Sequence, residues 1–265
     1  MSETLTEVKN LLKGGEFLVK ESNYNDTFTP EDLNEEQHMI IDMVTSFIDT
    51  EILPVYDKIE KQEPGLTESL LLKAGELGLL GLAIPEEYGG MGKDFNTNSL
   101  LVEYMAKGRS FSLSLGAHIG IGTLPIVYFG NEQQKQHYLP KLASGELKAA
   151  YCLTEPSSGS DALGAKTVAV LNEDGTKYIV NGQKMWITNS GFADVFIVFC
   201  QIDGNKFSCL ILEKGMDGLT LGAEEKKMGI KGSSTRQVFL ENVKVPKENL
   251  LGEIGKGHLI AFNIL

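Results

Sequence analysis

Apolar residues follow a helical period through the first half of the chain. They recur three or four positions apart at Ile40, Met43, Val44, Phe47, Ile48 and Ile52. This spacing is typical of a helix with one face packed on a core. Comparable patterns occupy residues 66–80, 99–106, 112–129 and 131–142. Residues 29–147 are therefore predicted to form an all-helical domain.

The boundaries of these helices are marked by capping and breaking residues. Pro54 is expected to stop the first long helix, because proline lacks an N–H group and clashes with the preceding turn. Asn131 and Gln134 have the spacing of a capping box, and Gly145 follows the last helical position. Residues 81–92 contain proline and several glycines, which predict a connector rather than a helix. This loop lacks the Lys-Ser/Thr ending of a phosphate-binding P-loop.

The period changes at residue 148. Short stretches rich in Val, Ile, Phe and Tyr follow, separated by turns, at residues 149–153, 165–171, 177–180, 185–188, 194–202, 207–213, 219–221 and 237–243. Residues 172–175 and 203–205 have the Asn, Asp and Gly of hairpin turns. Residues 148–252 are therefore predicted to form an antiparallel β-sandwich or barrel.

The two ends of the chain fit neither domain. Residues 1–28 are expected to be an extension with one short helix and one docking segment, on the strength of apolar positions such as Leu5, Val8 and Phe17. Residues 253–265 resemble the opening turns of another helix, and we expect them to start a domain that continues in a longer protein. The predicted fold class is α+β, with helices first and strands second.

Composition and charge exclude several classes of protein. The 265 residues are 42% hydrophobic and 23% charged, which is typical of a globular protein. The formal net charge of −12 would repel a phosphate backbone, so nucleic acid is not an expected partner. A phosphorylated cofactor stays possible, because backbone N–H groups and hydroxyls can bind phosphate locally.

The cysteines and the chain start bear on the compartment. Cys152, Cys200 and Cys209 have neither the number nor the spacing of a disulfide framework or a zinc site, so free thiols and no metal are predicted. We expect no integral membrane segment, since no apolar run approaches the ~18 residues that a membrane span needs. The N-terminus has no basic, apolar signal pattern, and a cytoplasmic protein is predicted.

Two short stretches carry the candidate chemistry. Residues 151–161 combine hydroxyl groups with a glycine, and residues 184–189 contain Trp186, the one tryptophan of the chain. Small hydrogen-bond donors beside a flat aromatic side chain suit a flat cofactor with polar edges and a phosphate tail. From the residues alone, a capped turn beside a core tryptophan explains the pattern equally well. Likewise, His118 lies among small and apolar residues and is interpreted as a packing residue.

These stretches resemble motifs of the acyl-CoA dehydrogenase family. The motifs occur in the family's order and are Thr154-Glu155-Pro156-x-x-Gly159-Ser160-Asp161, Gly182-x-Lys184-x-Trp186-Ile187-Thr188-Asn189 and Met228-Gly229-x-x-Gly232-Ser233-x-Thr235. The resemblance extends from about residue 34 to the end of the chain. One departure is Lys231, where the family commonly has arginine, which keeps the charge but changes the donor geometry.

The resemblance implies a helical domain, a β domain and a C-terminal helical bundle that together enclose FAD and an acyl-CoA thioester. By position, the implied FAD-binding residues are Tyr151, Leu153, Thr154, Gly159, Ser160, Trp186, Ile187 and Thr188. Trp186 would cover one face of the flavin and the Thr188 hydroxyl would approach flavin N5. Ser160 would also contact the CoA chain. Glu155, which precedes a proline, is interpreted as an architectural hydrogen-bond acceptor.

The implied reaction is α,β-desaturation of an acyl-CoA, as in fatty acid β-oxidation or related acyl-CoA catabolism. A carboxylate removes the α proton while the β hydride moves to the flavin. The resemblance places that glutamate beyond Leu265, so residues 1–265 alone are expected to be inactive and to bind FAD weakly. The implied partners are an electron-transfer flavoprotein and further copies of the chain, as a homodimer or homotetramer. The alternatives are an acyl-CoA oxidase-like flavoprotein and a catalytically silent scaffold of the same fold.

Overall fold

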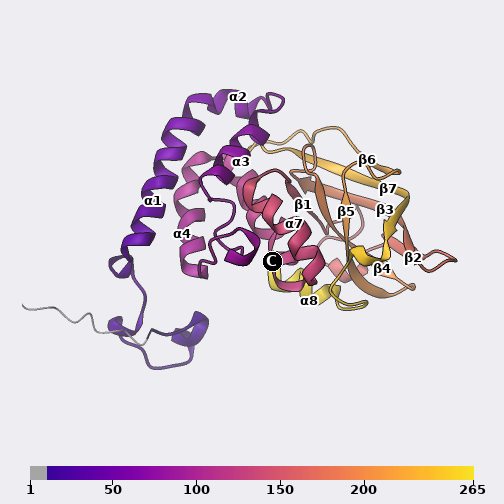
Figure 1. Cartoon of the computed structure of the whole chain (residues 1–265), viewed down its shortest axis with the longest axis horizontal. Helices are drawn as coiled ribbons and strands as arrows, with labels where there is room; N and C mark the ends of the chain where they lie inside the picture. Colours follow the sequence, from indigo (N-terminus) through magenta and orange to yellow (C-terminus); the bar gives the residue numbers. More distant parts are fainter. Residues whose placement is uncertain (1–10) are drawn as a thin grey trace, which may run out of the picture.

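Helices occupy the first half of the chain and strands most of the second, side by side (Figure 1). The structure is a computed structural model that describes residues 11–265. Its α-helices are α1 (Glu35–Phe47), α2 (Tyr56–Glu60), α3 (Leu66–Glu76), α4 (Phe95–Met105), α5 (Ser110–Ala117), α6 (Leu124–Phe129), α7 (Glu132–Ser144) and α8 (Gly257–Ile264). Two π-helical segments, η4 (Ile48–Ile52) and η8 (His118–Gly122), follow α1 and α5.

Short 3₁₀ turns lie before α1, between the helices and among the strands. They are η1 (Gly14–Leu18), η2 (Tyr24–Asp26), η3 (Pro30–Asp32), η5 (Leu53–Val55), η6 (Glu86–Tyr88), η7 (Ala106–Gly108), η9 (Ala162–Gly164) and η10 (Lys247–Asn249). The predicted stop at Pro54 is confirmed, because α1 continues as η4 only to Ile52, and Pro54 lies in the 3₁₀ turn η5, after which the short helix α2 begins. The capping box of Asn131 and Gln134 is confirmed, and so is the left-handed Gly145 that ends α7.

One helical run corrects the sequence analysis. Ser110–Phe129, which spans α5, η8 and α6, is 20 residues long and is apolar enough to cross a membrane by length and composition. The prediction that no apolar run approaches that length was therefore wrong. Most of the run, 61% of its most apolar window, is buried inside the protein, as in the core helix of a globular domain.

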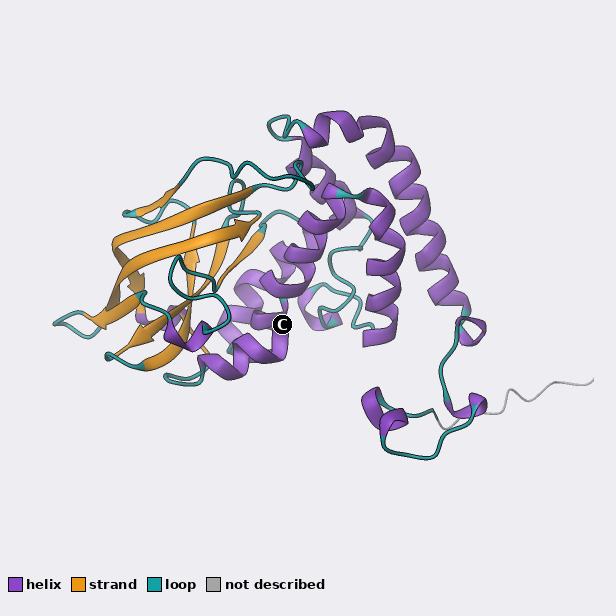
Figure 2. Ribbon diagram, turned by 180° about the vertical axis from the view of Figure 1, so that it is seen from behind, coloured by secondary structure: helices purple, strands orange, loops and turns teal. Residues whose placement is uncertain are grey.

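The strands form a single mixed sheet (Figure 2). They are β1 (Ala149–Cys152), β2 (Val168–Leu171), β3 (Lys177–Thr188), β4 (Val195–Ile202), β5 (Lys206–Glu213), β6 (Leu219–Leu221), β7 (Thr235–Pro246) and β8 (Leu250–Leu251). Their order is β6-β7-β3-β2-β4-β5-β8, with β1 also paired to β4. Most pairs are antiparallel as predicted, but β1 and β2 both run parallel to β4.

Strand β3 was expected as two separate stretches and is one strand of 12 residues. Its pairing with β7 shifts register twice, between Val180 and Gly182 and between Lys184 and Ile187. Each shift is a local irregularity that bends the strand and re-aims its side chains. The interruption in the apolar pattern therefore marked bulges rather than a strand end. Strand β8, of two residues, was not predicted.

The sheet contributes to two hydrophobic cores. One face of β1, β4 and β5 packs against α6, α7 and α8, and the other face lies in a core enclosed with β3 and β7. Cys209 belongs to the first core and Cys200 to the second, so the two cannot meet across the hairpin. All three cysteines are free and buried, as predicted, and burial raises the pKa of the Cys152 and Cys200 thiols to about 12.

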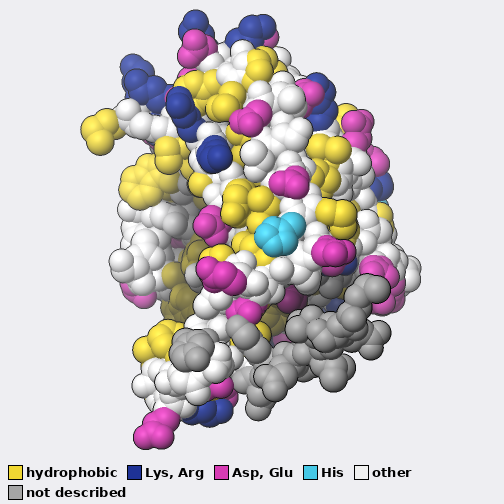
Figure 3. Space-filling model, turned by 90° about the vertical axis from the view of Figure 1, so that its left-hand side faces the viewer, with side chains coloured by type: hydrophobic (Ala, Val, Ile, Leu, Met, Phe, Trp, Pro, Cys, Tyr) yellow, Lys and Arg dark blue, Asp and Glu magenta, His cyan; other side chains and the backbone are white. Residues whose placement is uncertain are grey.

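The N-terminal extension lies beside the helices at the lower end of α1 and α4 (Figure 1). Phe17 shares a cavity with Phe95 at the start of α4, whereas Leu18 and Val19 are 75% and 84% exposed. Docking of this segment is thus limited, and Leu5 and Val8 lie outside the described residues. On the neighbouring helical face, hydrophobic and acidic side chains are mixed, and most basic ones gather towards the α2 end (Figure 3).

Candidate functional site

The eight residues proposed from the sequence to bind the cofactor all line one cavity of about 390 Å³. They come from the end of β1, from the loop that follows it and from the end of β3. The wall is completed by Ile121 of η8, Ala162 of η9 and the C-terminal residues Phe262 and Leu265. The structure therefore brings together two stretches that lie about thirty residues apart in the sequence.

The end of β3 is shaped by the second register shift. Trp186 has a left-handed backbone with φ of 58°, which is uncommon for a large side chain. Its side chain stands at the rim and is 61% exposed, while Ile187 is buried at 2%. Met185 N–H donates to the Thr154 carbonyl at 2.9 Å, so the bulged strand is fastened directly to the loop after β1.

A buried ion pair between Lys184 and Glu155 stabilises the loop that follows β1. Lys184 Nζ lies 2.7 Å from Glu155 Oε1 and donates to the Leu153 carbonyl at 3.3 Å. Glu155 also accepts the N–H groups of Lys166 and Thr167, at 2.5 and 3.0 Å. Burial alone would raise the pKa of Glu155, but the Lys184 charge and these hydrogen bonds lower it below its ordinary value. The interpretation of Glu155 as an architectural acceptor is confirmed.

Several polar groups of the cavity wall are left without protein partners. The hydroxyls of Thr154, Ser160 and Thr188 form no hydrogen bond with any residue in the described part of the chain. A Cβ atom added at Gly159 would meet nothing within 4 Å, so a ligand can approach the backbone there. By contrast, Ser158 Oγ donates to the Asp161 carbonyl at 2.6 Å and stabilises the turn itself.

Sequence reasoning missed Ile121 and Phe262 as cavity residues. The hydroxyls and the tryptophan were found from their residue types together with the family resemblance, whereas an apolar side chain in an apolar run gives no such signal. His118, three residues before Ile121, is the satisfied packing residue that was expected. Its Nδ1 accepts the Ala149 N–H at 3.1 Å, and its Nε2 lies 3.0 Å from the Leu142 carbonyl.

With this geometry in place, the chain can be compared with known proteins. Residues 34–146 match the description "Acyl-CoA dehydrogenase, N-terminal domain", and residues 150–243 match "Acyl-CoA dehydrogenase, middle domain". The chain belongs to the acyl-CoA dehydrogenase family. That family consists of FAD-dependent oxidoreductases, in agreement with the resemblance noted in the sequence.

Two relatives illustrate the match. The chain is 59% identical, over 253 residues, to a probable acyl-CoA dehydrogenase of Bacillus subtilis, and the match covers 96% of this chain and 43% of that protein. It is 42% identical to the human mitochondrial very long-chain specific acyl-CoA dehydrogenase, covering 89% of this chain and 38% of that protein. The chain thus spans less than half the length of these relatives.

Two solved structures share the fold. An acyl-CoA dehydrogenase from Bacillus anthracis, complexed with FAD, matches with a TM-score of 0.93 and 58% identity, over 96% of this chain and 43% of that one. Butyryl-CoA dehydrogenase from Megasphaera elsdenii matches with a TM-score of 0.81 and 38% identity, over 88% of this chain and 62% of that one. The helical part followed by a mostly antiparallel sheet is therefore the fold of the family.

Proposed function

We propose that this chain forms the flavin-binding part of an FAD-dependent acyl-CoA dehydrogenase. The observation that carries the proposal is the cavity wall, where three unpaired hydroxyls stand beside the exposed ring of Trp186. The family membership and the FAD bound in the Bacillus anthracis structure support it.

The donor set fits FAD. The hydroxyls of Thr154 and Thr188 would hold the polar edge of the flavin ring, and Trp186 would cover one face of it. Gly159 and Ser160 offer an open backbone and a hydroxyl to the phosphate tail. When bound, FAD supplies the acceptor for the hydride that leaves the acyl chain.

The cavity wall contains no carboxylate among residues 11–265. Removal of the α proton needs a base within hydrogen-bond reach of the substrate. We therefore place that base in a segment of the whole protein that is absent from this sequence, and residues 1–265 alone should show no turnover. Tight binding of oxidised FAD to this chain, together with loss of the flavin absorbance when an acyl-CoA is added, would contradict that placement.

A second, mainly apolar cavity of about 350 Å³ suggests where the acyl chain binds. It is lined by Gly116, Ile119 and Gly120 of the same helical run that contributes Ile121 to the flavin cavity. A Cβ atom at Gly116 or Gly120 would meet nothing within 4 Å, so both glycines leave room for a long chain. We propose a long-chain acyl-CoA as substrate. In the whole enzyme, Gly116→Leu should shift the preference to shorter chains, while Leu113→Ala, outside this cavity, should not.

The electron acceptor separates the competing functions. We propose an electron-transfer flavoprotein, as the original resemblance implies. The decisive experiment is to reduce the whole protein with acyl-CoA and to compare electron transfer to that flavoprotein with peroxide release. Rapid peroxide formation would favour the oxidase, and no flavin reduction at all would favour the silent scaffold. Cytoplasmic location and homo-oligomer assembly stay predictions.

A further inference from the structure

The last residues of β3 are held in place by pairing with the first residues of β7. Thr188 pairs with Thr235, and Ile187 pairs with Arg236. The register shift after Lys184 interrupts the pairing before them, so these two pairs form a short, isolated piece of ladder. Just beyond it, Asn189 N–H donates to the Ser234 carbonyl at 2.9 Å.

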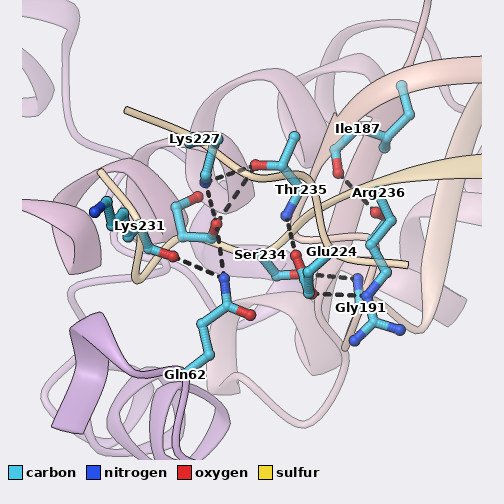
Figure 4. Close-up of polar contacts among 11 residues, drawn as sticks. Gln62, Ile187, Gly191, Glu224, Lys227, Lys231, Ser234, Thr235 and Arg236 are labelled. Carbon is cyan, nitrogen blue, oxygen red and sulfur yellow. Dashed lines mark hydrogen bonds and ion pairs between the residues drawn. The ribbon is translucent and has the colours of Figure 1, made fainter. Parts of the chain in front are cut away.

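One carboxylate holds this start of β7. Glu224 accepts hydrogen bonds from Ser234 Oγ at 2.6 Å, from Thr235 N–H at 2.8 Å and from Arg236 Nε at 2.7 Å (Figure 4). Ser234 Oγ in turn accepts the Gly191 N–H at 3.0 Å. Ser234, the first two residues of β7 and the turn after β3 are thereby joined through a single side chain.

The surroundings keep Glu224 charged. Burial alone would raise its pKa, but the hydrogen bonds from Ser234, Arg236 and the Thr235 N–H lower it below the ordinary value. The carboxylate is not part of the flavin cavity wall. It faces a separate cavity of about 220 Å³, between the turn that precedes α3 and the start of β7.

The helical part of the chain also contacts the loop between Glu224 and β7. Gln62 Nε2 donates to the Lys231 carbonyl at 2.7 Å (Figure 4). A Cβ atom at Gly232 would come within 2.6 Å of the Ile59 carbonyl, so the loop packs directly against the backbone near the end of α2. Lys227 Nζ donates to Thr235 Oγ1 at 2.9 Å and also to the Ser233 carbonyl. Residues 224–236 are therefore held by Gln62, by the contact with Ile59 and by Lys227 as well as by Glu224.

We infer that Glu224 is a positioning residue for the flavin cavity, which it serves by fixing the β7 residues that hold Ile187 and Thr188. The inference rests on the proposed function, since it assumes that the ligand facing Thr188 is a flavin. Glu224 acts through the β-ladder and contacts no ligand itself. Removing the carboxylate would leave the Arg236 cation and two further donors without their acceptor.

The test compares Glu224→Gln and Glu224→Ala with Glu225→Gln in the 265-residue chain. Glu225 is the matched control, because its carboxylate accepts only a 3.3 Å hydrogen bond from Gln237 Nε2 among the described residues. The first two readouts need no flavin: emission and acrylamide quenching of Trp186, the one tryptophan, and hydrogen exchange of the Asn189 amide. The third is FAD affinity at high FAD concentration, with the absorbance of the bound flavin.

We expect Glu224→Ala to speed exchange at Asn189 and to weaken FAD binding, each about tenfold, as the loss of one or two charged hydrogen bonds implies. Glu224→Gln should rescue part of both effects, because its amide oxygen still accepts. It should also shift the bound flavin absorbance while leaving the urea midpoint close to that of the Glu225→Gln control. This combination separates positioning from a general loss of stability.

One result would contradict the positioning role of Glu224, and another would contradict the proposed flavin binding. If Asn189 exchange and Trp186 emission in both Glu224 variants equal those of Glu225→Gln, the positioning role is wrong, whatever FAD does. If they respond but no variant and no parent chain binds FAD at any concentration, the flavin function fails while the structural link from Glu224 to β3 is upheld. Should Glu224→Ala fail to fold, Glu224→Gln alone carries the comparison.

Discussion

Two regions that meet at η8 differ in how their polar groups are paired. At His118 every polar atom has a partner: the ring bonds Ala149 and Leu142, and its carbonyl accepts Thr123 Oγ1 at 2.7 Å. At Ile121 the chain faces the proposed flavin cavity, where the hydroxyls of Thr154, Ser160 and Thr188 are unpaired within the described structure.

The difference in pairing distinguishes polar groups that stabilise the fold from polar groups that are available to bind a ligand. A buried polar group costs free energy unless it is hydrogen-bonded, so a fully paired group such as His118 stabilises the fold. Hydroxyls that converge on a cavity without partners contribute little to stability and are available to a ligand. The two kinds of site should therefore respond differently to substitution, in stability in the first case and in ligand affinity in the second.

The buried ion pair gives the largest predicted effect on the paired side. Lys184→Met would leave Glu155 buried without its cation, and loss of one partner of such a pair costs about 3–5 kcal/mol. We expect the free energy of unfolding to fall by that amount in urea titrations. Lys206→Met, which breaks an exposed pair with Asp203, should cost no more than about 0.5 kcal/mol. Equal losses in the two variants would contradict the architectural role of Lys184.

His118 predicts a pH dependence on the same side. Because Nδ1 accepts a backbone N–H, the ring is neutral with its proton on Nε2, and burial lowers the pKa of His118 from 6.5 to about 4. The unfolded chain therefore binds a proton first as pH falls. The free energy of unfolding should decrease between pH 6.5 and 4, by up to roughly 3 kcal/mol.

The matched comparison is His118→Gln, measured by urea unfolding at several pH values. It lowers stability at neutral pH, but it lacks the extra slope of the parent chain between pH 6.5 and 4. Carboxylates titrate in both chains, so only the difference between their slopes is diagnostic. Parallel curves would mean that His118 is not held neutral by burial.

The cavity hydroxyls should show the reverse behaviour, with the smallest effect on stability. Thr188→Val and Ser160→Ala remove groups without protein partners, and each should change the free energy of unfolding by less than about 0.5 kcal/mol. Each should weaken FAD binding about tenfold, since a flavin group loses its partner. Ser158→Ala, which removes the bond to Asp161, should cost about 1 kcal/mol of stability and affect FAD less.

The sequence predicted the helices, most strands and the cavity residues with distinctive chemistry. Helical periodicity and capping are local properties, and Thr154 or Trp186 stand out by residue type and by resemblance. The continuity of β3 was missed because its bulges interrupt the alternation, which depends on pairing with β7. Glu224 was missed because its role depends on a bond to a strand start ten or more residues away, which no spacing rule reveals.

Hydrogen exchange of the 265-residue chain with and without saturating FAD tests the central claim most directly. If the unpaired hydroxyls mark the flavin site, FAD should protect the amides of residues 153–162 and 185–190, and the helical residues 35–47 should be unchanged. Protection confined to another region, or none at FAD concentrations well above those that saturate the Bacillus anthracis acyl-CoA dehydrogenase, would contradict the account.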